Sequence, residues 1–264
     1  MTRADRFREL HRPGQPLLMP NPWDVGSARL LEAMGFQALA TTSSGFAASL
    51  GQLDGSVTRD EAVAHAAALA AAVEVPLSAD FENCFAHEPE GVAETVRRGV
   101  EAGLAGCSVE DNAKRPDDPV YEFAAAVERV RAAVEAADGR IVITARAENH
   151  VLGRDDLPDT IARLQAFEEA GADVLFAPGL RGRAQIRQVV ESVDRPVSVL
   201  GAPGAPPVTE LAQLGVSRVS VGGGFAFAAY GALVEAAEEL RDRGTYEYWE
   251  NTRRGVQAVR SAFS

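Results

Sequence analysis

The chain has 264 residues and little of several features that would restrict its class. Its two cysteines, Cys84 and Cys107, fit neither a disulfide framework nor a zinc pattern of paired cysteines. No apolar run approaches the length of a membrane span, and the N-terminal stretch "MTRADRFRELHRPGQP" lacks the apolar core of a signal peptide. These absences predict a soluble protein of the cytoplasm, where thiols stay reduced, with no membrane partner.

Positive charge is also scarce. Lys and Arg number 26 against 38 Asp and Glu, which gives a formal net charge of −12 at pH 7. Nucleic acids and anionic membranes require basic surface, so neither is an expected partner. A small anionic substrate remains compatible with this balance, because a small site can concentrate positive charge locally.

One pattern recurs along the chain and carries the prediction of the fold. Helical segments end in glycine and lead directly into a short apolar run, as in "LLEAMGFQALATT" and "AFEEAGADVLFAPG". Gly35, Gly103, Gly171 and Gly215 each stand where a helix C-cap favours a left-handed residue. The runs that follow are apolar throughout, which is typical of parallel strands covered by helices on the outside.

Reading the remaining runs in the same way gives eight strands with helices between them. We expect the strands near 16–20, 37–42, 76–80, 105–110, 140–145, 173–177, 196–200 and 217–221. The clearest helical patterns are 59–74, 90–102, 121–137, 156–170 and 181–193. This alternation predicts one α/β domain over residues 1–264, a (β/α)8 TIM barrel. Two further helices, 225–243 and 245–262, form a C-terminal extension that exceeds what a barrel needs to close.

Polar side chains gather where the predicted strands end, and in such a barrel these ends share one face. They are Trp23 after the first strand, Thr42, Ser43 and Ser44 after the second with Asp54 further on, Asp80 and Glu82 after the third, Glu110 after the fourth, and Arg146, Glu148 and Asn149 after the fifth. Carboxylates with room for water favour Mg²⁺ or Mn²⁺ over zinc. Arg146 would bind a substrate carboxylate or stabilise developing negative charge.

Each of these features has a simpler interpretation. An Asp after a strand is commonly a turn residue or a helix cap, and the "TTSSG" run offers the same capping chemistry. The glycines of "GGGF" at 222–225 suit a phosphate cradle or a tight packing turn. Cys107 is expected in the core, and Cys84 has no histidine at a spacing that would activate it as a nucleophile.

Together these motifs resemble the isocitrate lyase/phosphoenolpyruvate mutase superfamily, from about Asn21 to Tyr230. "NPWDVGSARLLEAMGF" resembles the N-terminal segment of that family, and "TTSSGFAASLGQLD" its pyruvyl-binding loop. "SVEDN" is similar to its Glu-Asp motif after the fourth strand, and "TARAEN" to its Ala-Arg motif on the fifth.

The resemblance implies a site and a chemistry. Mg²⁺ would be bound mainly through Asp80, with Glu82 and Glu110 reached directly or through water. The backbone and hydroxyls of Thr42, Ser43 and Ser44 would hold a pyruvyl unit, Asp54 would lie on a mobile loop over the site, and Arg146 would offset substrate charge. Such enzymes form a pyruvate enolate-like species from small 2-oxo or 2-hydroxy acids. A homodimer or homotetramer with exchanged terminal helices is also implied.

Two departures from the family pattern stand out. Asp80-Phe-Glu82 replaces the usual Asp-x-Asp, and the loop "EDNAKRPDDPVYEF" lacks the Lys-Cys-Gly-His motif of isocitrate and methylisocitrate lyases. We therefore expect a different reaction from isocitrate cleavage, with Lys114 and Arg115 free to contact a second carboxylate or a phosphonate. A barrel that binds a small acid without turnover, and a phosphate-binding barrel using "GGGF", are the competing hypotheses.

Overall fold

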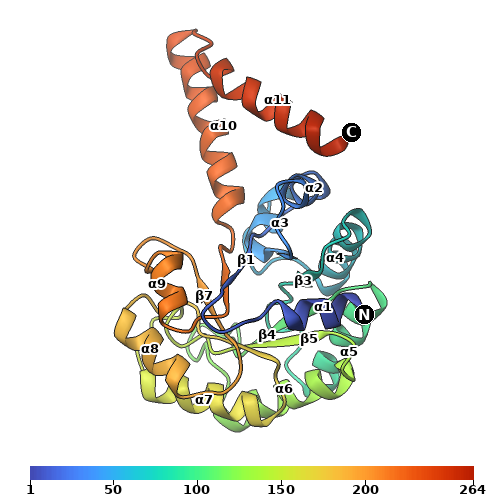
Figure 1. Cartoon of the computed structure of the whole chain (residues 1–264), viewed down its shortest axis with the longest axis vertical. Helices are drawn as coiled ribbons and strands as arrows, with labels where there is room; N and C mark the ends of the chain where they lie inside the picture. The colour runs from blue at the N-terminus through green and yellow to red at the C-terminus, as the bar shows by residue number, and fades with distance from the viewer.

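Eight parallel strands form the centre of the molecule in the computed structural model, which describes residues 1–264 (Figure 1). The strands are β1 (Leu17–Met19), β2 (Leu39–Ala40), β3 (Leu77–Ala79), β4 (Gly106–Glu110), β5 (Val142–Arg146), β6 (Val174–Phe176), β7 (Val197–Leu200) and β8 (Arg218–Ser220). Their order is β1-β8-β7-β6-β5-β4-β3-β2. The amide of Ala40 donates to the carbonyl of Pro20 at 3.1 Å across the remaining seam. The predicted (β/α)8 barrel is confirmed.

Helices alternate with the strands around the barrel. They are α1 (Arg3–Glu9), α2 (Val25–Ala33), α3 (Ser43–Ser49), α4 (Arg59–Ala72), α5 (Pro89–Glu101), α6 (Phe123–Ala137), α7 (Leu157–Glu169), α8 (Arg183–Glu191), α9 (Val208–Gln213), α10 (Gly224–Arg243) and α11 (Trp249–Phe263). The four glycines expected at helix ends all have positive φ, between 77° at Gly103 and 99° at Gly171. Left-handed caps therefore end these helices and turn the chain into the next strand.

The core lies between the strands and the helices around them. The largest cluster of buried apolar side chains includes Leu39, Leu77, Ile143 and Leu175 from the strands and Phe167 from α7. Burying such side chains stabilises the fold by about 1.5–3 kcal/mol each. The carboxyl ends of the eight strands are thereby held together on one face, which fixes the place of the site.

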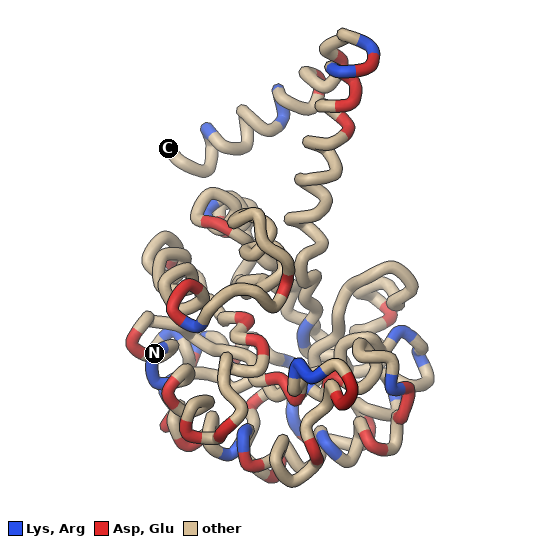
Figure 2. Tube along the Cα trace, turned by 180° about the vertical axis from the view of Figure 1, so that it is seen from behind, with Lys and Arg blue, Asp and Glu red and all other residues tan.

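The C-terminal helices differ from the rest because they leave the barrel. Figure 1 shows α10 projecting outward, with α11 turning back toward α2. Only Ala226 and Glu239 of α10 are buried, and no residue of α11 is. Figure 2 shows that the barrel-proximal part of α10 carries no charged residue. An exchange of helices between chains is not shown by a single chain. No helix is both long and apolar enough to traverse a lipid bilayer.

Candidate active site

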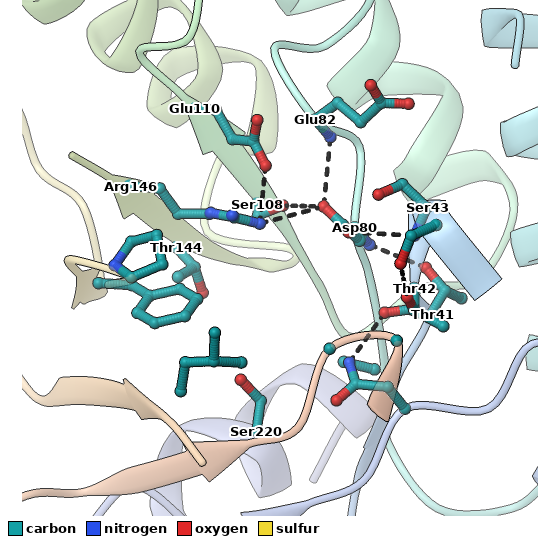
Figure 3. A pocket seen from close by; sticks show the side chains of 18 of the residues that line it. Thr41, Thr42, Ser43, Asp80, Glu82, Ser108, Glu110, Thr144, Arg146 and Ser220 are labelled. Atoms are coloured by element: carbon teal, nitrogen blue, oxygen red, sulfur yellow. Dashed lines mark hydrogen bonds and ion pairs between the residues drawn. The ribbon is translucent and has the colours of Figure 1, made fainter. Parts of the chain in front are cut away.

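A cavity of about 580 Å³ opens at the carboxyl ends of the strands (Figure 3). Ten of the twelve predicted site residues line it: Thr42, Ser43, Ser44, Asp54, Asp80, Glu82, Glu110, Lys114, Arg146 and Glu148. The other two, Trp23 and Asn149, do not. The carbonyl of Trp23 lies 3.0 Å from Nε2 of His65, and the amide of Asn149 donates to Asp159 at 2.6 Å. Their predicted role in substrate binding is therefore not supported.

The turn between β2 and α3 forms one wall of the cavity. Thr42 is the N-cap of α3, and its Oγ1 accepts from the amide of Gly45 at 3.3 Å, so the capping interpretation is right for this residue. The same turn also positions Asp80. The amide of Ser43 donates to Asp80 Oδ2 at 3.1 Å, and Thr41 Oγ1 accepts from the amide of Asp80 at 2.8 Å. Asp80 is thus fixed by contacts from the neighbouring strand end.

Arg146 joins three carboxylates at the centre of the site. Its Nη1 lies 2.7 Å from Glu110 and 3.3 Å from Asp80 (Figure 3), and its Nε lies 2.8 Å from Glu148. The register of β4 and β5 pairs Glu110 directly with Arg146, which explains the shortest of these distances. Because the fork of a guanidinium has fixed geometry, these three contacts hold the carboxylates in place.

Carboxyl groups outnumber cations in this cluster. Burial raises the pKa of Glu110, against the opposing effect of Arg146, and it raises the pKa of Glu148 in the same way. Burial acts to lower the pKa of Arg146, but Glu110, Glu148 and Asp80 together raise it. Arg146 therefore stays charged, and the carboxylates around it favour a further positive partner.

The loop after β3 is strained and held from outside the site. Glu82, Cys84 and Phe85 have φ values of 51°, 58° and 55°, in the left-handed region that non-glycine residues seldom adopt. Arg129 of α6, which sequence reasoning missed, donates to the carbonyl of Asn83 at 2.6 Å. Its other nitrogen, Nη1, donates to two more loop carbonyls, and these bonds supply the fixed partners that a strained backbone requires.

Both cysteines are buried, as expected of core residues. Burial raises the pKa of Cys84 to about 12, and the pKa of Cys107 is raised for the same reason. Because the thiolate is the reactive form, neither side chain is suited to act as a nucleophile.

Two loops border the open side of the cavity. Lys114, the only lysine of the chain, follows β4 and pairs its Nζ with Glu82 Oε2. Burial raises the pKa of Glu82, although this ion pair acts in the opposite direction. Asp54 lies exposed on the loop between α3 and α4 and also lines the cavity. Both residues are thus placed to contact whatever the cavity contains.

Asp111 supports the site from behind. Its Oδ1 accepts from the amide of Glu148 at 2.8 Å, and its Oδ2 accepts from Arg163 at 3.1 Å. Burial raises the pKa of Asp111 to about 6, although Arg163 and the Glu148 amide oppose this shift. Asp111 therefore orients the segment that carries Glu148 and does not line the cavity itself.

Sequence reasoning missed the hydroxyls and the second arginine inside the barrel. Ser108, Thr144, Arg218 and Ser220 also line the cavity. Inward residues of a strand alternate, so Thr144 precedes Arg146 by two positions on β5, and Arg218 precedes Ser220 by two on β8. The available signal was this alternation of polar residues, "TAR" and "RVS", within otherwise apolar strands.

The acids do not form a ready cage for a metal. No group of three or more His, Cys, Asp or Glu side chains is arranged to hold an ion directly. Mg²⁺ often keeps several waters and takes only one or two carboxylates. The excess of buried acids around Asp80 suits an ion held in that manner, and a cage of Asp80, Glu82 and Glu110 as three direct ligands is not present.

Comparison with known proteins places this cavity in context. The family model described as phosphoenolpyruvate phosphomutase matches residues 7–241. The 2-methylisocitrate lyase of Escherichia coli is 31% identical over 260 residues, covering 89% of this chain and 87% of that protein.

Solved structures agree with the family match. A protein of Burkholderia cenocepacia, assigned only to the general class lyase/mutase, is 50% identical with a TM-score of 0.91, over 94% of this chain and 91% of the other. A 2,3-dimethylmalate lyase, a member of the PEP mutase/isocitrate lyase superfamily, is 30% identical with a TM-score of 0.83, over 94% and 90% of the two chains.

Proposed function

The chain belongs to the phosphoenolpyruvate mutase/isocitrate lyase superfamily, and we propose that it is a Mg²⁺-dependent enzyme that cleaves a small 2-oxo or 2-hydroxy acid. Relatives in this superfamily are named lyases and mutases. The bond broken is a C–C or P–C bond next to a pyruvyl unit. In a 2-oxo acid the electron pair of this bond passes to the pyruvyl unit, which becomes enolate-like and then takes up a proton. In a 2-hydroxy acid the hydroxyl loses its proton and the pyruvyl unit leaves as a 2-oxo acid, so the electron pair passes to the other fragment, which becomes enolate-like and takes up the proton.

The observation that carries this proposal is the surplus of acids around Asp80. Five acids line the cavity against three cations: Asp54, Asp80, Glu82, Glu110 and Glu148 against Lys114, Arg146 and Arg218. Asp80 would hold Mg²⁺, with Glu82 and Glu110 reaching it directly or through water. When bound, the ion would supply a Lewis acid that polarises the 2-oxo group. The site is therefore expected to be complete only when the cationic metal and the anionic substrate are both bound.

The protein's own residues bind and orient the acid. Ser43 and Ser44 lie at the start of α3 and line the cavity, where their backbone and hydroxyls suit the carboxylate of the pyruvyl unit. Arg146 supplies positive charge at the place where charge develops, and its contacts with Glu110 and Glu148 fix its position in advance. The loops that carry Asp54 and Lys114 are placed to exclude water.

The reaction is expected to differ from isocitrate cleavage. The loop after β4 carries Lys114 where isocitrate-type lyases have their Lys-Cys-Gly-His motif, and both cysteines of this chain are buried. No cysteine can therefore return a proton to the enolate-like species. Appreciable cleavage of isocitrate or 2-methylisocitrate by the purified protein would refute this part of the proposal.

A panel assay tests the function. Purified protein is given oxaloacetate, substituted malates and phosphonopyruvate, and release of pyruvate or of the partner product is measured with Mg²⁺ and with a chelator. Turnover of at least one of these acids that needs the metal supports the proposal. Metal-dependent binding of oxalate without turnover of any of them would favour the competing view of a barrel that only binds an acid.

Self-association is a second part of the proposal. Leu18 points outward from β1 and is 43% exposed, because no helix of the same chain covers it. Leu233 and Val234 of α10 are 62% and 54% exposed. A helix from a second copy would cover both surfaces, as in a dimer or tetramer with exchanged helices. Light scattering should show an oligomer, and the double variant Leu233→Glu, Val234→Glu should shift it toward monomer; a monomeric parent would refute this part.

A further inference from the structure

Arg218 is a buried cation that the proposed chemistry leaves without a role. It begins β8, is 3% exposed, and lines the floor of the cavity. Its Nε donates to Ser198 at 2.9 Å, and its Nη1 donates to Thr144 at 3.1 Å and lies 3.3 Å from His11 Nε2. These contacts leave its Nη2 without a hydrogen-bond partner.

Every partner of Arg218 is neutral. His11 Nδ1 lies 2.8 Å from the carbonyl of Phe7, which can only accept, so Nδ1 carries the proton and Nε2 accepts from Arg218. Burial, with Arg218 adding to it, lowers the pKa of His11 to about 3, so the ring is neutral near pH 7. Ser198 and Thr144 offer only hydroxyls. Arg218 makes no salt bridge, whereas Arg146 makes three.

The surroundings of Arg218 do not remove its charge. Burial and the nearby charge of Arg146 lower the pKa of Arg218 to about 9, which leaves it protonated near pH 7. A buried cation without a counterion destabilises a fold. Since Arg218 borders the cavity, the cavity is where a compensating anion can enter.

We infer that Arg218, with the hydroxyls of Thr144 and Ser220, binds a second carboxylate of the substrate. Thr144 and Arg218 stand two positions before Arg146 and Ser220 on their strands, so Thr144 and Arg218 lie one layer deeper in the barrel than Arg146, and Ser220 lies one layer above Arg218. Figure 3 shows Thr144 and Ser220 away from Ser43, the side that suits the pyruvyl carboxylate. The substrate class is thereby a dicarboxylate. This inference rests on the proposed function.

Lys114 is the other cation that a second carboxylate could use, and the structure favours Arg218. The ammonium group of Lys114 is already paired with Glu82, and it sits on an exposed loop. Arg218 is 3% exposed and pairs with no acid. A carboxylate gains more from a desolvated, unpaired guanidinium than from an ammonium group that must first leave its partner.

The test compares ligands with and without a distal carboxylate. Calorimetry with Mg²⁺ measures the binding of oxalate, of both malate enantiomers and of lactate, which matches malate without the distal carboxylate. The parent protein should bind one malate about 10- to 100-fold more tightly than lactate. In Arg218→Met this preference should fall below about threefold, while oxalate binding changes less than about threefold. Arg218→Lys should keep part of the preference, because it keeps the charge.

The outcomes separate this inference from the proposed function. Failure of oxalate to bind the parent with Mg²⁺ would refute the proposed function. Normal oxalate binding with no preference for malate in the parent, or an unchanged preference in Arg218→Met, would overturn the inference alone. If Arg218→Met does not fold stably, the inference is tested by the preference for malate over lactate in the parent and in Arg218→Lys.

Discussion

The two arginines inside the barrel have opposite environments. Arg146 contacts three carboxylates, and the cluster around it holds more acids than bases. Arg218, one layer deeper, contacts two hydroxyls and a neutral imidazole and no acid. One cavity therefore has an end where acids outnumber cations and an end with a cation and no acid.

This difference indicates what the cavity is built to receive. The acidic end suits a divalent cation, and the Arg218 end suits an anion. A dicarboxylate that meets the metal with its pyruvyl end and Arg218 with its other end would complete both at once.

Replacing Asp80 should have the largest effect on activity. Asp80→Asn removes the main charge at the acidic end, and we expect metal-dependent turnover to fall by about 10³-fold or more. Asp60→Asn is the matched control, because Asp60 is an exposed acid that pairs with Arg98 on the outside of the barrel. Steady-state kinetics with Mg²⁺ varied measures both variants. Full activity in Asp80→Asn would exclude the metal assignment.

Removing each arginine should affect stability in opposite ways. Arg146→Met leaves buried carboxylates without their partner, and we expect a loss of about 3–5 kcal/mol in the free energy of unfolding. Arg218→Met removes an unpaired charge and should leave stability equal or higher. Urea unfolding without metal or ligand measures both. Equal losses of unfolding free energy in the two variants would show that groups of the protein already offset the charge of Arg218.

The Arg218 end should also be the acid-sensitive end. The pKa of His11 is lowered to about 3, so the native state binds fewer protons than the unfolded chain between that value and 6.5. Stability from His11 is therefore complete above about pH 6.5 and is lost as the pH falls, by about 2 kcal/mol at pH 5. His11→Gln, which keeps a donor and an acceptor, should flatten this part of the profile. An equal change in unfolding free energy between pH 6.5 and pH 5 in the parent and in His11→Gln would contradict this prediction.

Lys114 should have the smallest effect. It lies on an exposed loop, so Lys114→Met is expected to lower kcat/KM by about 3- to 10-fold, without the loss of preference for malate over lactate that Arg218→Met should cause. Lys114 is the only lysine, and selective acylation of it offers an independent check on the unmutated chain. If Lys114→Met reduced the preference for malate more than Arg218→Met does, Lys114 and not Arg218 would be the residue that binds the second carboxylate.

Much of the fold and of the acidic end could be predicted from the sequence. Glycine caps such as Gly171 and apolar runs such as β4 are local signals, and barrel topology then brings Asp80, Glu110 and Arg146 to one face. The cavity lining confirms their grouping, although no cage of three acids forms. Short α1 and α3 were not predicted, because seven residues carry too little periodicity.

The Arg218 end could not be predicted in the same way. An arginine within "RVSV" gives no local indication of whether an acid will reach it. His11 and Thr144 lie 207 and 74 positions away, and only the closed barrel brings them to Arg218. Trp23 and Asn149 do not line the cavity for a related reason, because a strand-end position fixes the face and not the direction of the side chain.

A crystal structure grown with Mn²⁺ and malate tests the central claim most directly. Anomalous scattering locates the ion, and the map shows both carboxylates of the ligand. We predict Mn²⁺ beside Asp80, with one carboxylate of malate near Ser43 and the other within hydrogen-bond distance of Arg218 Nη2. An ion elsewhere, or a distal carboxylate bound to Lys114 with Arg218 unpaired, would contradict the account.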